Sequence, residues 1–152
     1  HTAPTCSPTR SMLFTGADSH VVGLGNMKEL LAENQKGKPG YEGGLNGRAP
    51  TVATLLQGAG YHTYLSGKWH LGYTIEGAEK FGKKKKGAME GAPLGAVTLN
   101  GPITRGFDSF FGFHHARMMK SVFENDRVTQ KIEPVDMLPA LVKRVLANLP
   151  TP

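Results

Sequence analysis

The sequence contains little of what defines several common protein classes. Its 152 residues include one cysteine, so an internal disulfide framework and a cysteine-rich zinc site are both excluded. No apolar run is long enough for a membrane-spanning helix. The chain starts with neither an initiator methionine nor a secretory signal, and we therefore expect it to be an internal piece of a longer protein.

Positive charge, in contrast, is abundant. The formal net charge is +6, and much of it comes from the segment KFGKKKKG at residues 80–87. A basic tract of this kind can bind nucleic acid, but such a function needs a fold signature that the sequence lacks. Glycines bracket the lysines, so we interpret the tract Lys83–Lys86 as a solvated loop and expect no nucleic-acid partner.

Helix and strand signals alternate along the first half of the chain. Pro8 and Gly16 bracket a short predicted helix at residues 8–15. A second helix is predicted from an apolar face with helical spacing, formed by Val52, Leu55, Leu56 and Ala59. Residues 61–66 follow as an aromatic and β-branched strand. This alternation is typical of an α/β fold.

The second half is less regular. Residues 73–104 are predicted to form a surface loop or insertion, with a short strand near residues 97–99. Residues 105–113 are aromatic and expected to be partly buried. A final amphipathic helix has Asp136 as its expected N-cap. Its apolar stripe, which needs a partner surface, consists of Leu138, Leu141, Val142, Val145, Leu146 and Leu149.

The sequence does not match several familiar motifs. A cysteine phosphatase loop has five residues between its cysteine and arginine, whereas Arg10 is the fourth residue after Cys6. The sequence around Lys68 lacks the first glycine and the hydroxyl residue of a Walker loop, and GLGNMK breaks the dinucleotide pattern. His114 and His115 are adjacent, so a strand would turn them to opposite faces and away from a shared metal.

Two stretches remain as candidates for chemistry. Cys6 lies at the predicted start of a helix, where unpaired N–H groups favour an anion, and Arg10 adds a fixed positive charge one turn later. Lys68 and His70 alternate just after the predicted strand, so an extended chain would place them on one face. Together these residues predict a site that handles a tetrahedral oxyanion.

These two stretches match one family. Residues 4–16, PTCSPTRSMLFTG, resemble the first sulfatase signature with core C-x-P-x-R, and residues 60–72, GYHTYLSGKWHLG, resemble the second. Residues 105–113 are similar to a Gly-Phe-Asp aromatic segment of arylsulfatase-like members. The resemblance implies an alkaline-phosphatase-like α/β fold, with a mostly parallel sheet flanked by helices. Residues 1–152 would then be a partial catalytic domain without its N-terminal metal-binding strand and C-terminal part.

The resemblance also implies a chemistry for the lone cysteine. A maturation enzyme that reads Cys6, Pro8 and Arg10 would oxidise the cysteine to Cα-formylglycine. One hydroxyl of the hydrated aldehyde would attack the sulfur of a sulfate ester, in a small molecule or a sulfated carbohydrate. The other hydroxyl would then help to expel sulfate.

Each remaining role follows from the same resemblance. Cys6, as formylglycine, would also be a ligand to Ca²⁺ or Mg²⁺, with further acidic ligands expected outside this chain. Arg10 would hold the aldehyde hydrate, Lys68 would bind its hydroxyl and the sulfate, and His70 would orient or deprotonate the diol.

Two other functions stay open at this point. The same diol site can attack phosphorus, so a phosphonate or phosphate ester hydrolase is one alternative. An inactive truncated copy is the other, and we expect the isolated piece to be inactive. The family resemblance implies a periplasmic, secreted or lysosome-like compartment.

Overall fold

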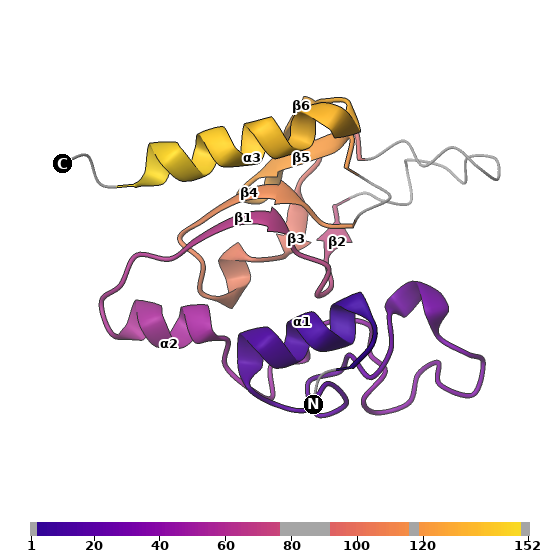
Figure 1. Cartoon of the computed structure of the whole chain (residues 1–152). Helices are drawn as coiled ribbons and strands as arrows, with labels where there is room; N and C mark the ends of the chain where they lie inside the picture. Colours follow the sequence, from indigo (N-terminus) through magenta and orange to yellow (C-terminus); the bar gives the residue numbers. More distant parts are fainter. Residues whose placement is uncertain (1–2, 77–91, 116–118, 150–152) are drawn as a thin grey trace.

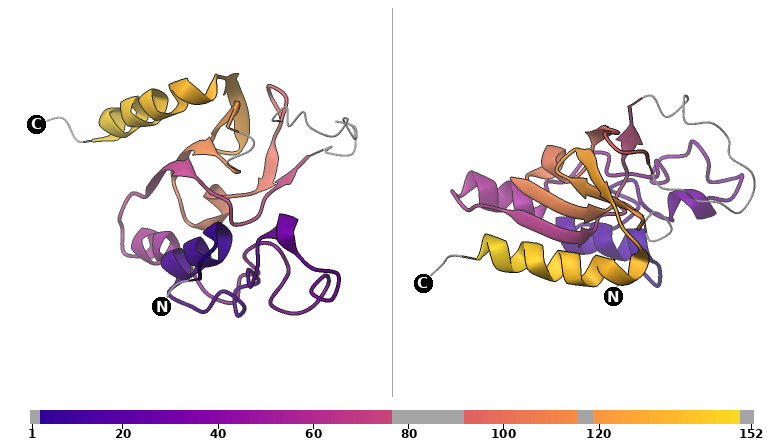
Figure 2. Two further views of the ribbon diagram at one scale, coloured as in Figure 1. Left: turned by 45° about the vertical axis from the view of Figure 1, so that its right-hand side comes forward. Right: turned by 90° about the horizontal axis from the view of Figure 1, so that it is seen from above.

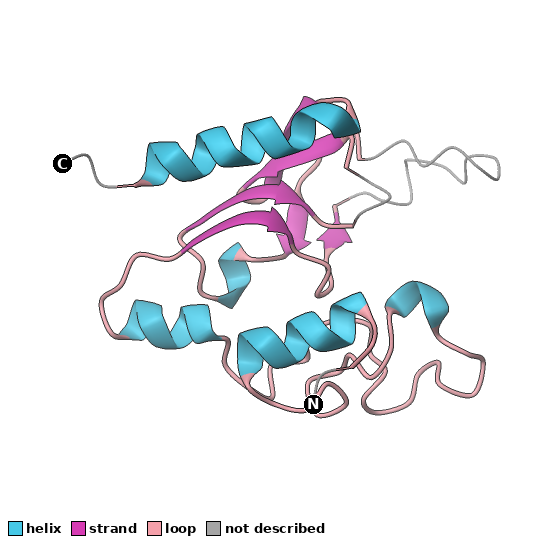
Figure 3. Cartoon of the chain, in the orientation of Figure 1, coloured by secondary structure: helices cyan, strands magenta, loops and turns pink. Residues whose placement is uncertain are grey.

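The computed structural model describes residues 3–76, 92–115 and 119–149 (Figure 1). The main helices and strands, in chain order, are α1 (Cys6–Thr15), α2 (Val52–Gly58), β1 (Tyr64–Lys68), β2 (Thr74–Ile75), β3 (Thr98–Asn100), β4 (Ser109–Phe113), β5 (Ser121–Glu124), β6 (Arg127–Lys131) and α3 (Pro134–Asn148). Figure 3 shows that a long loop region separates α1 from α2. Within that region lies a single 3-10 turn, Lys28–Leu30.

The sheet confirms the α/β class and is mixed. Its strand order is β1-β4-β5-β6, in which β1 and β4 are parallel and the other two pairings are antiparallel. We expected a mostly parallel sheet, but among the described residues β1 and β4 are the only parallel pair of this sheet. The antiparallel β5–β6 pairing follows from the short connection between these strands, because strands joined by a tight turn can pair only in antiparallel fashion.

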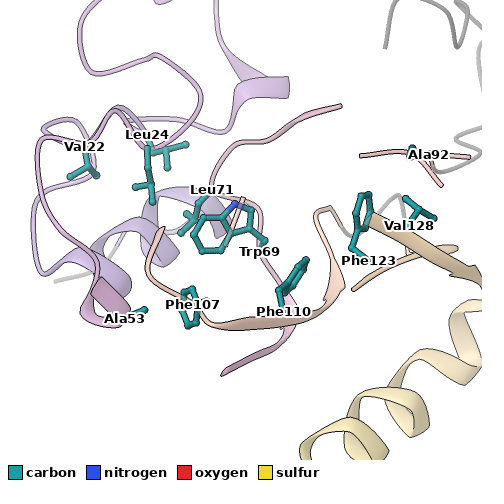
Figure 4. Close-up of a cluster of buried hydrophobic side chains, with 12 residues drawn as sticks. Val22, Leu24, Ala53, Trp69, Leu71, Ala92, Phe107, Phe110, Phe123 and Val128 are labelled. Atoms are coloured by element: carbon teal, nitrogen blue, oxygen red, sulfur yellow. The ribbon is translucent and has the colours of Figure 1, made fainter. Parts of the chain in front are cut away.

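The helices cover both faces of this sheet. Figures 1 and 2 show α3 on one side and α1 with α2 on the other. Side chains of β4 alternate between the two faces of the sheet. Phe110 packs in the cluster that includes Ala53 of α2. Phe111 packs in the cluster that includes Met137 of α3. In Figure 4, Trp69 lies in the middle of the first cluster, next to Leu71.

One glycine pair allows the parallel strands to approach. Gly67 of β1 lies opposite Gly112 of β4, and a Cβ atom on Gly112 would collide with the carbonyl oxygen of Gly67. The sheet therefore needs glycine at this position of β4, two residues before His114.

The two predicted amphipathic helices exist, but their apolar faces are not where the pattern placed them. In α2, Val52, Leu55 and Leu56 are exposed, and Ala53 is the buried contact. The predicted stripe of α3 is also largely exposed, since it contains the exposed residues Leu138, Val142, Val145, Leu146 and Leu149. The sheet contacts of α3 come instead from Met137, Ala140 and Leu141. Glu133 rather than Asp136 is its N-cap, with proline at the first helical position.

Residues 73–104 are only partly described. The short strand expected near residues 97–99 is present as β3, and it pairs antiparallel with β2. The lysine tract Lys83–Lys86 lies outside the described residues. Among the described helices, none is long and apolar enough to cross a membrane.

Candidate active site

Cys6 occupies the first position of α1, two residues earlier than the predicted helix start. Thr5, the N-cap, is extended at φ −128° and ψ 152°, and its side chain makes no capping hydrogen bond. The Cys6 thiol is free and exposed. It therefore lies beside the unpaired N–H groups and the positive end of the helix dipole, where an anion is stabilised.

Arg10 connects the two stretches that contain Cys6 and Lys68. Its Nε–H donates to the carbonyl oxygen of Trp69 at 2.8 Å, and its Nη2 donates to the carbonyl oxygen of Lys68. Burial lowers the pKa of Arg10, whereas its electrostatic interaction with Cys6 acts in the opposite direction. Arg10 thus interacts with the thiol of one stretch and the backbone of the other, so the structure brings both into one site.

The segment after β1 is fixed by a buried tryptophan. Lys68 is the last residue of β1 and lies opposite Phe113 of β4. The next residue, Trp69, donates its backbone N–H to the Phe113 carbonyl at 2.9 Å and its indole Nε1–H to the Gly72 carbonyl at 2.8 Å. Lys68 is half-buried, and no ion pair to it is found among the described residues. Its ammonium group is therefore available for an anionic ligand.

His70 does not follow the extended geometry that the alternation with Lys68 assumed. Its φ is +55°, in the left-handed region, so the shared-face argument from the sequence is wrong. Its side chain is nonetheless close enough to Lys68 for an electrostatic effect. Burial, followed by repulsion from Lys68, lowers the pKa of His70 to about 4, although Glu29 acts to raise it. His70 is therefore neutral at neutral pH.

Glu29 has no signal in the sequence, and His115 was considered there only as a possible metal ligand together with His114. Glu29 Oε1 lies 3.1 Å from Nε2 of His70 and 2.7 Å from Nε2 of His115. Glu29 comes from the 3-10 turn Lys28–Leu30, and His115 follows the end of β4. No local pattern marks Glu29, because it reaches His70 only through the tertiary fold.

His114 and His115 lie in a bend after β4, not in a strand, and they have different surroundings. His114 is fully buried, stacked on Tyr73 and edge-to-face with Phe123. His115 is directed to Glu29 and makes an edge-to-face contact with His70. The two adjacent histidines therefore do not share a ligand.

The described residues include one cluster of side chains that could ligate a metal ion. One group of three or more potential ligands is found among them, formed by Glu29, His70 and His115, whose ligand atoms lie within 4.8 Å of one another. Two imidazoles and one carboxylate suit ions such as Zn²⁺, whereas Ca²⁺ takes six to eight oxygen ligands. Among the described residues, Cys6 belongs to no such group.

Relatives of known name match parts of the chain. An uncharacterized sulfatase of Schizosaccharomyces pombe is 57% identical over 77 residues, which cover 49% of this chain and 14% of that protein. The arylsulfatase of Klebsiella aerogenes is 42% identical over 73 residues, covering 48% of this chain and 15% of that protein. The steryl-sulfatase of Mus musculus is 33% identical over 113 residues, covering 72% of this chain and 14% of that protein. The matched segments thus cover about one-seventh of the length of these relatives.

A solved structure supports the fold, and a family model gives the family. The solved structure of Ps i-CgsB superposes with a TM-score of 0.57 over 95% of this chain and 30% of that chain, at 19% identity, which supports the fold alone. The family model described as Sulfatase matches residues 1–143, and this range includes Cys6, Arg10, Lys68 and His70. Because that match covers nearly all of the chain, the protein belongs to the sulfatase family.

Proposed function

We propose that the full-length protein hydrolyses sulfate esters, with an arylsulfatase-like preference, through a formylglycine derived from Cys6. One observation carries the proposal: Arg10 binds the backbone carbonyls of Lys68 and Trp69 and interacts electrostatically with Cys6. The names of the arylsulfatase and steryl-sulfatase relatives support the substrate class. The chain itself would be one part of a larger catalytic domain, consistent with the fraction of its relatives that it covers.

The position of Cys6 fits the modification. The side chain is exposed at the first residue of α1, with Pro8 and Arg10 at the spacing that the maturation enzyme of the family reads. Once oxidised and hydrated, this residue would supply the hydroxyl that attacks the sulfur of the ester. The N-terminal end of α1 favours negative charge at this point.

Lys68 and Arg10 supply the positive charge for the substrate. Lys68 ends β1 without an acidic partner among the described residues, so its ammonium group can bind the sulfate oxygens. Arg10 keeps its charge but uses Nε and Nη2 for the backbone of residues 68–69. We therefore assign sulfate binding mainly to Lys68, and to Arg10 the task of holding Lys68 near residue 6.

His70 is the proton acceptor. Its low pKa, about 4, keeps the imidazole unprotonated at neutral pH, so it can take a proton from a hydroxyl at residue 6. The Ca²⁺ or Mg²⁺ ion expected for the family would use Cys6, as formylglycine, together with ligands from outside the described residues. A periplasmic, secreted or lysosome-like compartment and a formylglycine-generating maturation enzyme belong to the same proposal.

A substrate comparison on the full-length protein tests this function. The protein would be produced with an active maturation enzyme and assayed on one aryl alcohol, linked in turn to sulfate, phosphate and phosphonate. A higher kcat/KM for the sulfate ester supports the proposal. A higher kcat/KM for a phosphorus ester would assign the protein to the phosphorus-ester hydrolases, and absence of turnover on all three would identify an inactive copy.

A further inference from the structure

The carboxylate of Glu29 binds two histidine rings that are distant in the sequence. The Glu29 side chain is about one-third exposed, whereas the His70 and His115 side chains are 9% and 15% exposed. The three residues come from three segments: the turn Lys28–Leu30, the segment after β1 and the end of β4. Contacts with these two largely buried rings hold the Glu29 carboxylate in one position.

These contacts determine which nitrogen of His70 carries the proton. A carboxylate can only accept hydrogen bonds, so each ring must present an N–H to Glu29 Oε1. Neutral His70 has one N–H, and the 3.1 Å contact places it on Nε2. Nδ1 is then the nitrogen with a free lone pair. It is buried and has no hydrogen-bond partner among the described residues.

A metal ion is a weaker explanation of the same cluster. Zinc binds ligand atoms at about 2.0–2.1 Å in tetrahedral geometry, which separates two ligands by about 3.3 Å. Glu29 Oε1 and His115 Nε2 are only 2.7 Å apart, a length typical of a charge-assisted hydrogen bond. The distances therefore favour direct hydrogen bonds over two ligands that share an ion.

The charges around the rings are consistent with this arrangement. Burial acts to raise the pKa of Glu29, but hydrogen bonds from its own backbone N–H and from His115, together with attraction by His70, leave that pKa below its ordinary value. Glu29 is thus ionised at neutral pH. Lys68 and His115 both act to lower the pKa of His70, and Glu29 is the group that opposes them.

We propose that Glu29 is a positioning residue for His70: it accepts the Nε2–H, holds the ring in that tautomer and leaves Nδ1 as the basic nitrogen. His115 donates to the same oxygen and keeps the carboxylate in place. This restraint on the His70 ring matters because the His70 backbone has φ +55°. A non-glycine residue keeps such a conformation only where its surroundings impose it. This role rests on the proposed sulfatase function.

Kinetics of the full-length protein test the proposal, with Glu29→Gln as the main variant. The amide oxygen can still accept from both rings, but the variant loses the negative charge that strengthens these hydrogen bonds and raises the pKa of His70. We expect kcat to fall about 10- to 100-fold, on the scale of losing an outer partner of a functional histidine. KM should change little, because Lys68 is untouched. The acidic limb of the kcat profile should move to lower pH, since Glu29 raises the pKa of His70.

Two further variants distinguish positioning from a purely structural role. Glu29→Asp keeps the charge and should recover part of kcat and the position of the acidic limb. Glu33→Gln is the matched control, because Glu33 is exposed and pairs only with Lys36 in the same loop region. It should behave as wild type. An equal, pH-independent loss in Glu29→Gln and Glu29→Asp, or wild-type kinetics in Glu29→Gln, would overturn the proposal.

A spectroscopic measurement tests the tautomer without any turnover. In the full-length protein labelled with ¹⁵N-histidine, long-range ¹H–¹⁵N correlation should show His70 protonated on Nε2 and not on Nδ1, with His70→Asn identifying the signal. Protonation on Nδ1 would overturn the proposal, and so would an Nε2 without a proton, as metal ligation produces. This result is independent of the substrate comparison, so the tautomer and the sulfatase function can fail separately.

Discussion

Arg10 and Trp69 are 59 residues apart in the sequence, yet the Arg10 Nε–H donates to the Trp69 carbonyl oxygen at 2.8 Å. This hydrogen bond, together with the one to the Lys68 carbonyl, fixes α1 against the end of β1. The relative position of residue 6 and Lys68 therefore depends on a side chain to which the resemblance assigns the aldehyde hydrate.

The first prediction concerns this connection. Arg10→Ala should lower the free energy of unfolding by about 2 kcal/mol, because it removes two charge-assisted hydrogen bonds and leaves two carbonyl groups without their donor. Thermal unfolding of the full-length protein measures the loss. Arg48→Ala is the control, since Arg48 is exposed. An equal effect of the two substitutions would mean that the Arg10 contacts contribute nothing specific.

The second prediction concerns sulfate binding. Lys68→Ala should reduce kcat/KM by about 100-fold or more, corresponding to at least about 2.7 kcal/mol of transition-state stabilisation, the scale of one preorganised oxyanion donor. Lys84→Ala, in the tract outside the described residues, should have little effect. Steady-state kinetics on an aryl sulfate check the difference, and comparable losses in both variants would show that Lys68 is not directed at the substrate.

The third prediction separates a catalytic from a structural His70. His70→Ala should slow steady-state turnover by about 10²- to 10⁴-fold, as expected for loss of a general base or acid. If His70 acts in the release of sulfate, one equivalent of alcohol should still appear in a rapid burst, with added mass on the peptide containing Cys6. The exposed His62, replaced by alanine, is the control. A variant that unfolds, or one that turns over normally, would return His70 to a structural role.

The fourth prediction concerns acid stability and His114. Burial lowers the pKa of His114 to about 3, and both ring nitrogens lack a hydrogen-bond partner among the described residues. Between pH 6.5 and 3 the unfolded chain binds a proton at this position and the folded protein does not. Stability should therefore fall as the pH is lowered through this window, by up to about 1.4 kcal/mol per pH unit.

His114→Phe tests this acid effect. Phenylalanine keeps an aromatic ring against Tyr73 and Phe123 but cannot be protonated. Melting temperatures of the full-length variant should depend less on pH between 6.5 and 4 than those of wild type. His62→Phe, at an exposed position, should keep the wild-type dependence. An unchanged pH dependence in His114→Phe would show that His114 is not the group responsible.

Local signals in the sequence predicted the elements that carry the site. The proline and glycine around α1 located that helix to within two residues, and Gly16 adopts the left-handed conformation expected at a helix end. β1 begins three residues later than predicted. The cause is the turn after α2, in which the N–H of Tyr61 still donates to the Leu56 carbonyl at 3.0 Å.

Contacts that depend on the tertiary fold could not be predicted in this way. Glu29 lies in an irregular loop region and approaches His70 and His115 across 41 and 86 residues of sequence. The left-handed φ of His70 likewise has no local signal, because non-glycine residues seldom adopt it. Periodicity also could not show that the apolar side chains of α3 are exposed. The spacing of apolar residues identifies one face of a helix, but it does not show whether another element packs on that face.

If Cys6 becomes the nucleophile of a sulfatase, the residue must carry an aldehyde that peptide mass spectrometry can detect. The full-length protein would be produced with an active formylglycine-generating enzyme, digested and treated with a carbonyl-reactive probe, with the variant Cys6→Ala as the blank. We predict that the peptide containing residue 6 carries an aldehyde and reacts with the probe. A free thiol at Cys6 as the sole species, with the maturation enzyme shown to be active on another substrate, would contradict it.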